Sequence, residues 1–235
     1  MGTLVSYQLN EGVATIAMDD GKANALSPAM QAELNAALDQ AVADKAVVVL
    51  TGRTGMFSAG FDLPTLTTGG MNAVNMLSGG FELAERLLNF PRPVVVACSG
   101  HALAMGVFLL LCADYSVGAE GSFKLGANEV AIGLTLPRSA IEICRARLAP
   151  AHFNRALLTS EIYAPAEAIA AGFLDRLAPA AEVLAEAQAV AARFTKLNAA
   201  AYKSSKTLLR EPMLKALRLS IEADKAAFRV LAKVG

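Results

Sequence analysis

The stretch that most constrains the fold runs from Pro93 to Ala113 and reads PVVVACSGHALAMGVFLLLCA. Its valine run, Val94 to Val96, is β-branched and has no polar interruption, which is typical of a strand buried on both faces. Small residues follow the strand, and the apolar segment from Val107 to Cys112 predicts a buried helix. Because small residues let a ligand approach the backbone, and the first amides of a helix attract negative charge, this turn favours an oxyanion.

An earlier stretch, which begins at Val47 and reads VVVLTGRTGMFSAGFDL, has the same order of valine run, glycine-containing turn and small residues. If the two units lie side by side, the N–H groups of Phe61 and Met105 could converge on one carbonyl oxygen, as in an oxyanion hole. A plainer interpretation also stands, because valine runs followed by glycine turns are ordinary strand–turn sequences of an α/β protein. Spacing alone leaves both interpretations open.

The rest of the chain predicts a mixed α/β protein without a linker, a charge block or a low-complexity tract. The region 71–90 predicts a helix weakened at Ser78-Gly79-Gly80 and therefore mobile. We expect a core over residues 1–180 and a helical C-terminal region over 181–235 that serves oligomerisation. The other predicted elements are a hairpin over 4–18, a helix from Ser27-Pro28, a loop over 64–70, strands over 114–117 and 122–124, and helices over most of 138–235 with a break at Glu211-Pro212.

Composition narrows the partners. Hydrophobic residues make up 54% of the chain and charged residues 18%, which predicts surface buried between subunits of a homo-oligomer. Lys plus Arg and Asp plus Glu both number 21, so no net charge favours nucleic acid or an anionic membrane. The apolar runs are too short to span a bilayer and the N-terminus lacks a hydrophobic leader, which predicts a cytoplasmic protein.

The cysteines Cys98, Cys112 and Cys144 are odd in number and have no metal-like spacing, so we expect buried thiols and no metal site. His101 lies three residues from Cys98, which keeps a Cys-His hydrolase acting on a thioester as an alternative.

Four motifs in order resemble those of the enoyl-CoA hydratase/isomerase (crotonase) superfamily over about residues 3 to 230. They are Lys22 to Leu26, Phe57 to Leu63, Gly100 to Gly106, and Phe123 to Pro137. Ala171 to Asp175 resembles the short strand of this family. The resemblance implies an α/β fold built as a crotonase-like spiral of ββα units, and an assembly of trimers, sometimes paired into hexamers.

Glu129 is the only acid between Glu120 and Glu142, and its neighbours are mostly apolar. Loss of hydration raises the pKa of a carboxyl and suits it to proton transfer near neutral pH. The residues alone also allow a glutamate on a solvated turn. The resemblance aligns Glu129 with a catalytic glutamate, and Phe61 and Met105 with the oxyanion donors.

The hydratases of the family resemble one another in carrying a second glutamate, at the position that Phe108 occupies here. Water addition is commonly described with two carboxylates, whereas a double-bond isomerase needs one. The resemblance therefore implies a Δ3-Δ2-enoyl-CoA isomerase with Glu129 as its single proton carrier. An enoyl-CoA hydratase of fatty acid β-oxidation and a non-catalytic acyl-CoA-binding protein remain as alternatives.

The resemblance implies an acyl-CoA thioester substrate and no separate cofactor, because coenzyme A is part of the substrate. The residues assigned to the coenzyme A side are Lys22, Asn24, Ala25, Ala59 and Asp62, with the adenine amino group near the Ala59 carbonyl. Those assigned to the acyl pocket are Phe108, Met71 and Leu77, although methionines at helical spacing are also typical of a core. The lysine that frequently follows the Asp-Leu pair in the family is Pro64 here.

Overall fold

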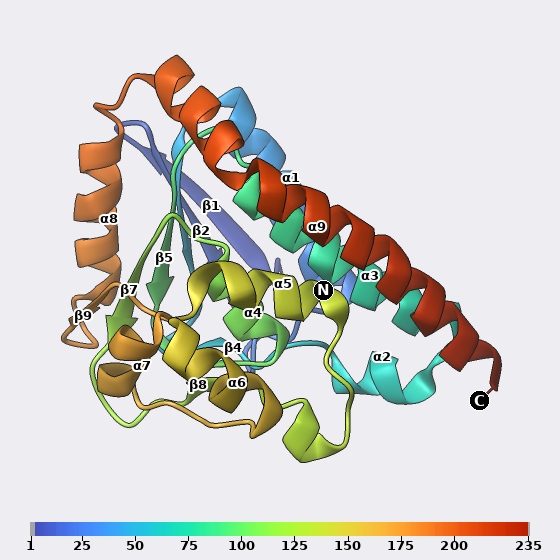
Figure 1. The fold of residues 1–235 in the computed structure, drawn as a ribbon. Helices are drawn as coiled ribbons and strands as arrows, with labels where there is room; N and C mark the ends of the chain where they lie inside the picture. The colour runs from blue at the N-terminus through green and yellow to red at the C-terminus, as the bar shows by residue number, and fades with distance from the viewer. Residues whose placement is uncertain (1–2, 235) are drawn as a thin grey trace.

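The computed structural model describes residues 3–234 as two β-sheets surrounded by helices (Figure 1). The larger sheet has six strands in the order β1-β2-β3-β5-β7-β9, and within it only the β1–β2 pair is antiparallel. Its strands are β1 (Val5–Asn10), β2 (Val13–Met18), β3 (Val47–Thr51), β5 (Val94–Cys98), β7 (Tyr115–Ala119) and β9 (Arg176–Ala178). The predicted N-terminal hairpin is confirmed, with Val5 paired to Met18.

The smaller sheet has three parallel strands, β4 (Gly55–Ser58), β6 (Gly100–Leu103) and β8 (Leu125–Gly126). The chain repeats one passage: a strand of the larger sheet, a strand of the smaller sheet, and then helix. The passages are β3, β4, α2 (Leu63–Thr68); β5, β6, α4 (Met105–Leu111); and β7, β8, α5 (Arg138–Arg147). This repeat is the predicted spiral of ββα units, and the α/β class is confirmed.

The central strands β3 and β5 are buried along their whole length, as the valine runs predict. Val49 and Val95 pack with α8 (Val183–Phe194) on one face of the larger sheet. Val48 and Val96 face the other way, into a core shared with α1 (Pro28–Ala43), α3 (Gly70–Leu88) and α4. Helices thus cover both faces of the sheet, which is why each of these strands begins with three valines and does not alternate apolar with charged residues.

The helices begin largely where the sequence predicts. Ser27 caps α1 by accepting a hydrogen bond from Met30 N at 3.2 Å, with proline in the first turn. The helices are α1 (Pro28–Ala43), α2 (Leu63–Thr68), α3 (Gly70–Leu88), α4 (Met105–Leu111), α5 (Arg138–Arg147), α6 (Pro150–Leu158), α7 (Pro165–Ala171), α8, and α9 (Ala199–Val234).

The predicted break at Glu211-Pro212 is wrong, because α9 runs through Pro212 without interruption. Pro212 is exposed, so the carbonyl that loses its helical partner can be solvated. Ion pairs and hydrogen bonds hold the helix on both sides of the proline. Lys206 and Arg210 bind Asp114 at 2.7 and 2.9 Å, and Asp224 accepts hydrogen bonds from the first amides of α5. Figure 1 shows α9 lying along α3 and α5.

Three smaller predictions are corrected. Residues 64–70 are not all loop, because α2 covers most of them. Residues 122–124 are not a strand, and the pairing begins at Leu125. Residues 171–175 are not a strand either, because Gly172 ends α7 in the left-handed conformation and β9 begins at Arg176.

The two C-terminal helices both pack on the rest of the chain, α8 on the larger sheet and α9 on α3 and α5. The boundary at residue 180 and a role in oligomerisation stay predictions.

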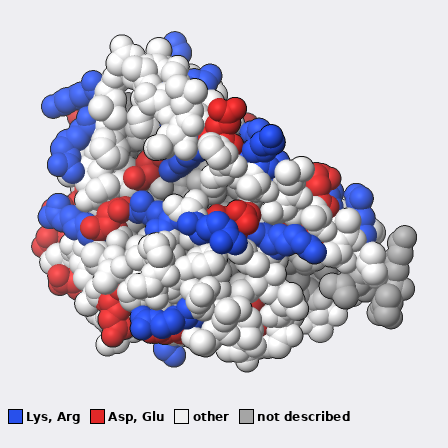
Figure 2. All heavy atoms as spheres, viewed as in Figure 1, with Lys and Arg blue, Asp and Glu red and all other residues white. Residues whose placement is uncertain are grey.

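Within residues 3–234, no helix is both long enough and apolar enough to cross a membrane. Acidic and basic side chains are intermixed on the face in Figure 2.

Candidate active site

Three segments leave the smaller sheet at one edge. The strands β4, β6 and β8 are parallel, so their carboxyl ends lie together, which is where open α/β sheets commonly place their ligands. Phe61 follows β4, Met105 follows β6 and Glu129 follows β8. Three separate sequence motifs are therefore brought to the same edge of one sheet.

The first turn depends on Gly60, whose φ of +98° favours glycine. A Cβ placed on Gly60 would lie 3.1 Å from Met105 N and 2.8 Å from Ala104 Cβ, so the two turns touch there. The Gly60 carbonyl accepts a hydrogen bond from Leu26 N at 2.8 Å. Because that carbonyl and the Phe61 N–H belong to one trans peptide unit, the N–H points away from Leu26.

The second turn depends on Ala104, which has φ +48° and ψ −129°, a conformation that is strained for any residue with a side chain. It directs the chain into α4, whose first residue is Met105. Within residues 3–234, neither the Phe61 N–H nor the Met105 N–H donates a hydrogen bond. The two turns therefore offer two adjacent main-chain donors to an acceptor.

The strain at Ala104 predicts a stability change. Ala104→Gly removes the Cβ and should raise the free energy of unfolding by about 1 kcal/mol, because this backbone region costs a non-glycine residue about 1–3 kcal/mol. Urea unfolding measures the change. The matched control is Ala102→Gly in β6, which removes a fully buried methyl group and should destabilise. Equal destabilisation by both substitutions would contradict strain at Ala104.

Glu129 is only 7% exposed, and its Oε2 has no hydrogen-bond partner within the described residues. Burial raises the pKa of this carboxyl from its ordinary 4.5 to about 7, and the Glu129 amide only partly opposes the shift. The neighbouring segment is held to the second turn, since Ala104 N donates to the Gly126 carbonyl at 3.1 Å. The predicted loss of hydration is confirmed, and the catalytic role stays a prediction.

Sequence reasoning missed a second polar group beside the acid. The Oδ1 atom of Asn128 is buried and has no partner among residues 3–234, as is true of the neighbouring Glu129 Oε2. Buried polar atoms are almost always satisfied in folded proteins, so two such oxygens on consecutive residues mark a place that a ligand can occupy. The signal available in the sequence was the asparagine directly before the lone acid.

The enoyl-CoA hydratase/isomerase family matches residues 8–234. The chain belongs to this family. It is 36% identical to a putative enoyl-CoA hydratase of Thermus thermophilus over 73% of this chain and 70% of the relative. A probable enoyl-CoA hydratase of Bacillus subtilis is 32% identical over 55% of this chain, and the match spans 52% of that relative's length.

A solved structure from Mycobacterium tuberculosis is 45% identical and superposes with a TM-score of 0.94 over 98% of both chains. It is described as a probable enoyl-CoA hydratase. A second structure of that protein, with 45% identity and a TM-score of 0.92 over 96% of this chain and 99% of the other, is described as an enoyl-CoA isomerase. The choice between these two activities therefore rests on the residues of the site.

Phe108, which stands where the resemblance places the second glutamate of hydratases, is 1% exposed in α4. Its ring stacks on that of Phe81, with centroids 6.4 Å apart. Phe81 in turn meets the Phe61 ring edge-on at 6.2 Å. Phe108 is thus part of a row of aromatic rings that ends at one of the two oxyanion candidates.

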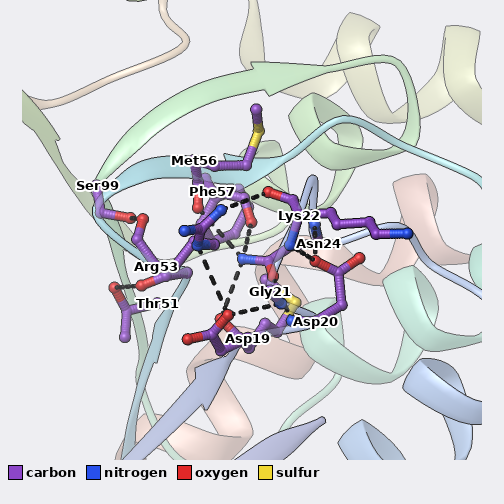
Figure 3. Close-up of polar contacts among 12 residues, drawn as sticks. Asp19, Asp20, Gly21, Lys22, Asn24, Thr51, Arg53, Met56, Phe57 and Ser99 are labelled. Atoms are coloured by element: carbon purple, nitrogen blue, oxygen red, sulfur yellow. Dashed lines mark hydrogen bonds and ion pairs between the residues drawn. The ribbon is translucent and has the colours of Figure 1, made fainter.

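The segment carrying Asn24 forms a polar network (Figure 3). Asn24 is fully buried, and its Nδ2 donates to the carbonyls of Met18, Met56 and Phe57 while its Oδ1 accepts from Asp20 N. Although burial opposes it, main-chain N–H groups that include that of Ala25 hold the pKa of the Asp20 carboxyl below its usual range. These side chains shape the segment, so ligand contacts here would involve its backbone.

Lys22 and Ala59 are placed differently. The Lys22 side chain is exposed and extends away from the network in Figure 3, where its carbonyl accepts from Arg53. Ala59 N donates to the Ala23 carbonyl at 2.9 Å, and the Ala59 carbonyl accepts no hydrogen bond from the described residues. The Lys22 side chain and the Ala59 carbonyl are therefore available for the coenzyme A contacts that the resemblance implies, and these contacts stay predictions.

Asp62 has a structural task that the sequence did not reveal. Its carboxylate accepts from Thr65 N at 2.9 Å and Thr65 Oγ1 at 2.7 Å, which caps α2. Its predicted contact with coenzyme A stays a prediction. Of the predicted pocket residues on α3, Leu77 is half-buried, and Met71 is 53% exposed at the start of the helix.

The Cys-His alternative is disfavoured by the environment of Cys98. Burial raises the pKa of this thiol to about 12, and Sγ donates to the Gly100 carbonyl. His101 Nδ1 accepts from Lys124 N at 2.9 Å, which is a structural role. Cys112 and Cys144 are also buried, and no cluster of three potential metal ligands occurs within residues 3–234.

Proposed function

We propose that the chain is a Δ3-Δ2-enoyl-CoA isomerase in which Glu129 is the only proton carrier and the N–H groups of Phe61 and Met105 bind the thioester oxygen. The observation that carries this proposal is the isolation of Glu129. Burial, and not a neighbouring charge, raises its pKa. A second carboxylate in contact would raise the pKa by repulsion, and the position that would supply one holds Phe108.

The proposed reaction moves one proton. The Glu129 carboxylate removes a proton from C2 of a 3-enoyl thioester, and the electron pair spreads over a dienolate whose oxygen accepts hydrogen bonds from the two amides. The protonated Glu129 then returns the proton to C4, and the double bond lies between C2 and C3. An oxyanion donor contributes about 3 kcal/mol, and a positioned base about 10²–10⁴ in rate.

Phe108 has a passive part in this scheme. Its ring and that of Phe81 form an apolar wall, and the Phe81 ring contacts the ring of Phe61. An apolar wall keeps water from the dienolate and strengthens the hydrogen bonds to its oxygen. It also leaves no second acid to handle a water molecule, so the proposal favours isomerisation over hydration.

Membership of the family supports an acyl-CoA thioester as the proposed substrate, and the individual contacts are proposed with it. Coenzyme A enters as part of the thioester, with the Ala59 carbonyl available to the adenine amino group and Lys22 to a phosphate. Asn24 and Ala25 set the backbone beside the nucleotide, and Met71 and Leu77 line the acyl path. A cytoplasmic homotrimer, or a pair of trimers, remains our expectation for the assembly.

A substrate comparison tests the proposal. Purified protein should convert 3-hexenoyl-CoA to its 2-enoyl isomer, seen as a rise in the conjugated thioester absorbance. Hydration of crotonyl-CoA, seen as a fall in that absorbance, should be slower by about 10² or more because a second positioned acid is missing. Faster hydration than isomerisation would make the chain a hydratase, and binding without either reaction would make it an acyl-CoA-binding protein.

The pKa of Glu129 predicts the pH profile. The base must be ionised, so kcat/KM for 3-hexenoyl-CoA should increase about tenfold per pH unit below pH 7 and level off above it. Initial rates between pH 5 and 9 measure the profile. A profile that is flat from pH 5 to 8 would show that Glu129 is not the titrating base.

A further inference from the structure

Two adjacent glycines, Gly79 and Gly80, lie in the middle of α3, where glycine is less favourable than alanine. The sequence predicts a weakened helix here, yet α3 runs unbroken from Gly70 to Leu88. An unfavourable residue inside an intact helix points to a neighbour that needs the space of a side chain. For Gly79 that neighbour is the buried amide of Gln31, and for Gly80 it belongs to the active site.

The Phe61 ring packs against the backbone of Gly80, in the space that a side chain at this position would fill, and we call this space the seat of the ring. A Cβ on Gly80 would overlap the edge of this ring, with Cζ at 2.6 Å, and would lie 3.7 Å from Met105 Cε. Real Cβ atoms essentially never show contacts as close as the first. The side chains of both oxyanion candidates therefore reach the same point of α3, and one of them needs the absence of a side chain there.

The peptide unit that carries the Phe61 N–H is restrained at two places. The peptide unit between Gly60 and Phe61 is anchored at one end, where the carbonyl accepts from Leu26 N at 2.8 Å. Its N–H donates no hydrogen bond within residues 3–234, so the bond from Leu26 restrains this peptide unit only at the carbonyl end. A second restraint is the Phe61 side chain, whose ring lies against Gly80 and meets the ring of Phe81.

We propose that Gly80 is a positioning residue: by admitting the Phe61 ring into α3, it aims the Phe61 N–H at the thioester oxygen. The kinetic test of this role rests on the proposed function, because it measures isomerisation. The spectroscopic test needs only a thioester that binds. Preorganised donors act without moving during the reaction, so a small displacement of the ring should weaken catalysis more than binding.

Gly80→Ala tests the proposal through kinetics. We expect kcat for 3-hexenoyl-CoA to fall at least about tenfold, since loss of a whole oxyanion donor costs about 10²–10³, while KM changes less than about threefold. The matched control is Gly118→Ala in β7, where the new methyl would overlap the Leu174 side chain within the larger-sheet layer instead. The control should keep its kcat. Equal losses in both variants would reduce Gly80 to a packing residue.

A spectroscopic assay tests the same point without turnover. Butyryl-CoA is saturated and cannot isomerise or add water, and the stretching frequency of its ¹³C-labelled carbonyl falls as hydrogen bonds to the oxygen strengthen. We expect a clear red shift on binding to the unmodified protein and a smaller shift in Gly80→Ala. Phe61→Leu shortens the side chain over the new methyl, so Gly80→Ala/Phe61→Leu should recover part of the shift.

The outcomes separate the two proposals. A normal carbonyl shift without enoyl turnover would contradict the isomerase and leave the seat intact. Equal shifts in the unmodified protein and Gly80→Ala would overturn the positioning role, and so would no shift in the unmodified protein. If Gly80→Ala does not fold, Phe61→Leu alone is the test variant, because it removes the ring from the seat without a steric clash. It should also reduce the carbonyl shift, and an unchanged shift would overturn the positioning role.

Discussion

Replacing Glu129 with Gln is expected to reduce kcat for 3-enoyl-CoA isomerisation by about 10²–10⁴, because the carboxamide cannot accept the C2 proton. Affinity for a saturated acyl-CoA should stay within about threefold, since the change is nearly isosteric and the two oxyanion amides are untouched. Stopped-flow or steady-state assays give kcat, and calorimetric titration with butyryl-CoA gives the affinity. Retained turnover in Glu129→Gln would remove Glu129 from the mechanism.

The pH dependence of the unfolding free energy of Glu129→Gln provides a control for damage to the fold. The pKa of Glu129 is about 7 in the folded protein and near its ordinary 4.5 in the unfolded chain. Between these values the folded state holds the proton more tightly, so this group makes the protein less stable as pH rises from about 4.5 to 7. Gln does not titrate. We expect Glu129→Gln to be more stable than the unmodified protein at pH 8, by up to about 3 kcal/mol, and nearly equal to it at pH 4.

Urea unfolding at the two pH values measures this difference. A loss of activity accompanied by lower stability of the variant at pH 8 would indicate general damage to the fold. It would also contradict the expectation that the buried, ionised Glu129 carboxylate destabilises the unmodified protein. The stability measurement therefore separates loss of the base from loss of the fold.

The architecture could be predicted because its signals are local and repeated. The valine runs beginning at Val47 and Val94 each identify a strand buried on both faces, and the small residues after them identify the turns. The repeat then places Phe61 and Met105 in neighbouring parallel units, where pairing of β4 with β6 brings their turns together. A periodic pattern needs no knowledge of distant contacts.

The errors arose where tertiary contacts override local preference. Pro212 normally ends a helix, but α9 is held through it by ion pairs from Lys206 and Arg210 to Asp114 and by Asp224 at the start of α5. The helix over 71–90 was predicted correctly, but the reason for its glycines was not, because a Cβ at Gly79 or Gly80 would overlap the side chain of Gln31 or Phe61. No sequence window contains both partners of such contacts.

Some roles of the candidate-site residues could be predicted from the sequence, and others could not. Glu129 stood out as a lone acid among apolar residues, but the residues alone also allowed a solvated turn, and the resemblance to the family decided between the two. The capping role of Asp62 and the saturated hydrogen bonds of Asn24 could not be found, because an Asp or Asn beside a turn is equally suited to bind a ligand or the backbone.

Phe108→Glu introduces the residue that, by the resemblance, the family's hydratases carry at this position, and we expect it to destabilise the protein instead of creating a hydratase. The substitution removes a buried ring that stacks on Phe81 and places a carboxyl in its apolar site. Loss of the ring alone typically costs about 3–5 kcal/mol when Phe is truncated. Because ionising a buried carboxyl adds a further cost, the loss should be greater at pH 8 than at pH 5.

Phe108→Leu is the matched control, since it shortens the side chain but keeps the site apolar, and it should cost less at both pH values. Urea unfolding of both variants, with crotonyl-CoA hydration assayed alongside, checks the prediction. The aromatic row from Phe108 through Phe81 to Phe61 also predicts that Phe108→Glu loses isomerase activity, because the ring over Gly80 loses its support. A stable Phe108→Glu variant that hydrates crotonyl-CoA would show that one residue, and not this packed row, separates the two activities.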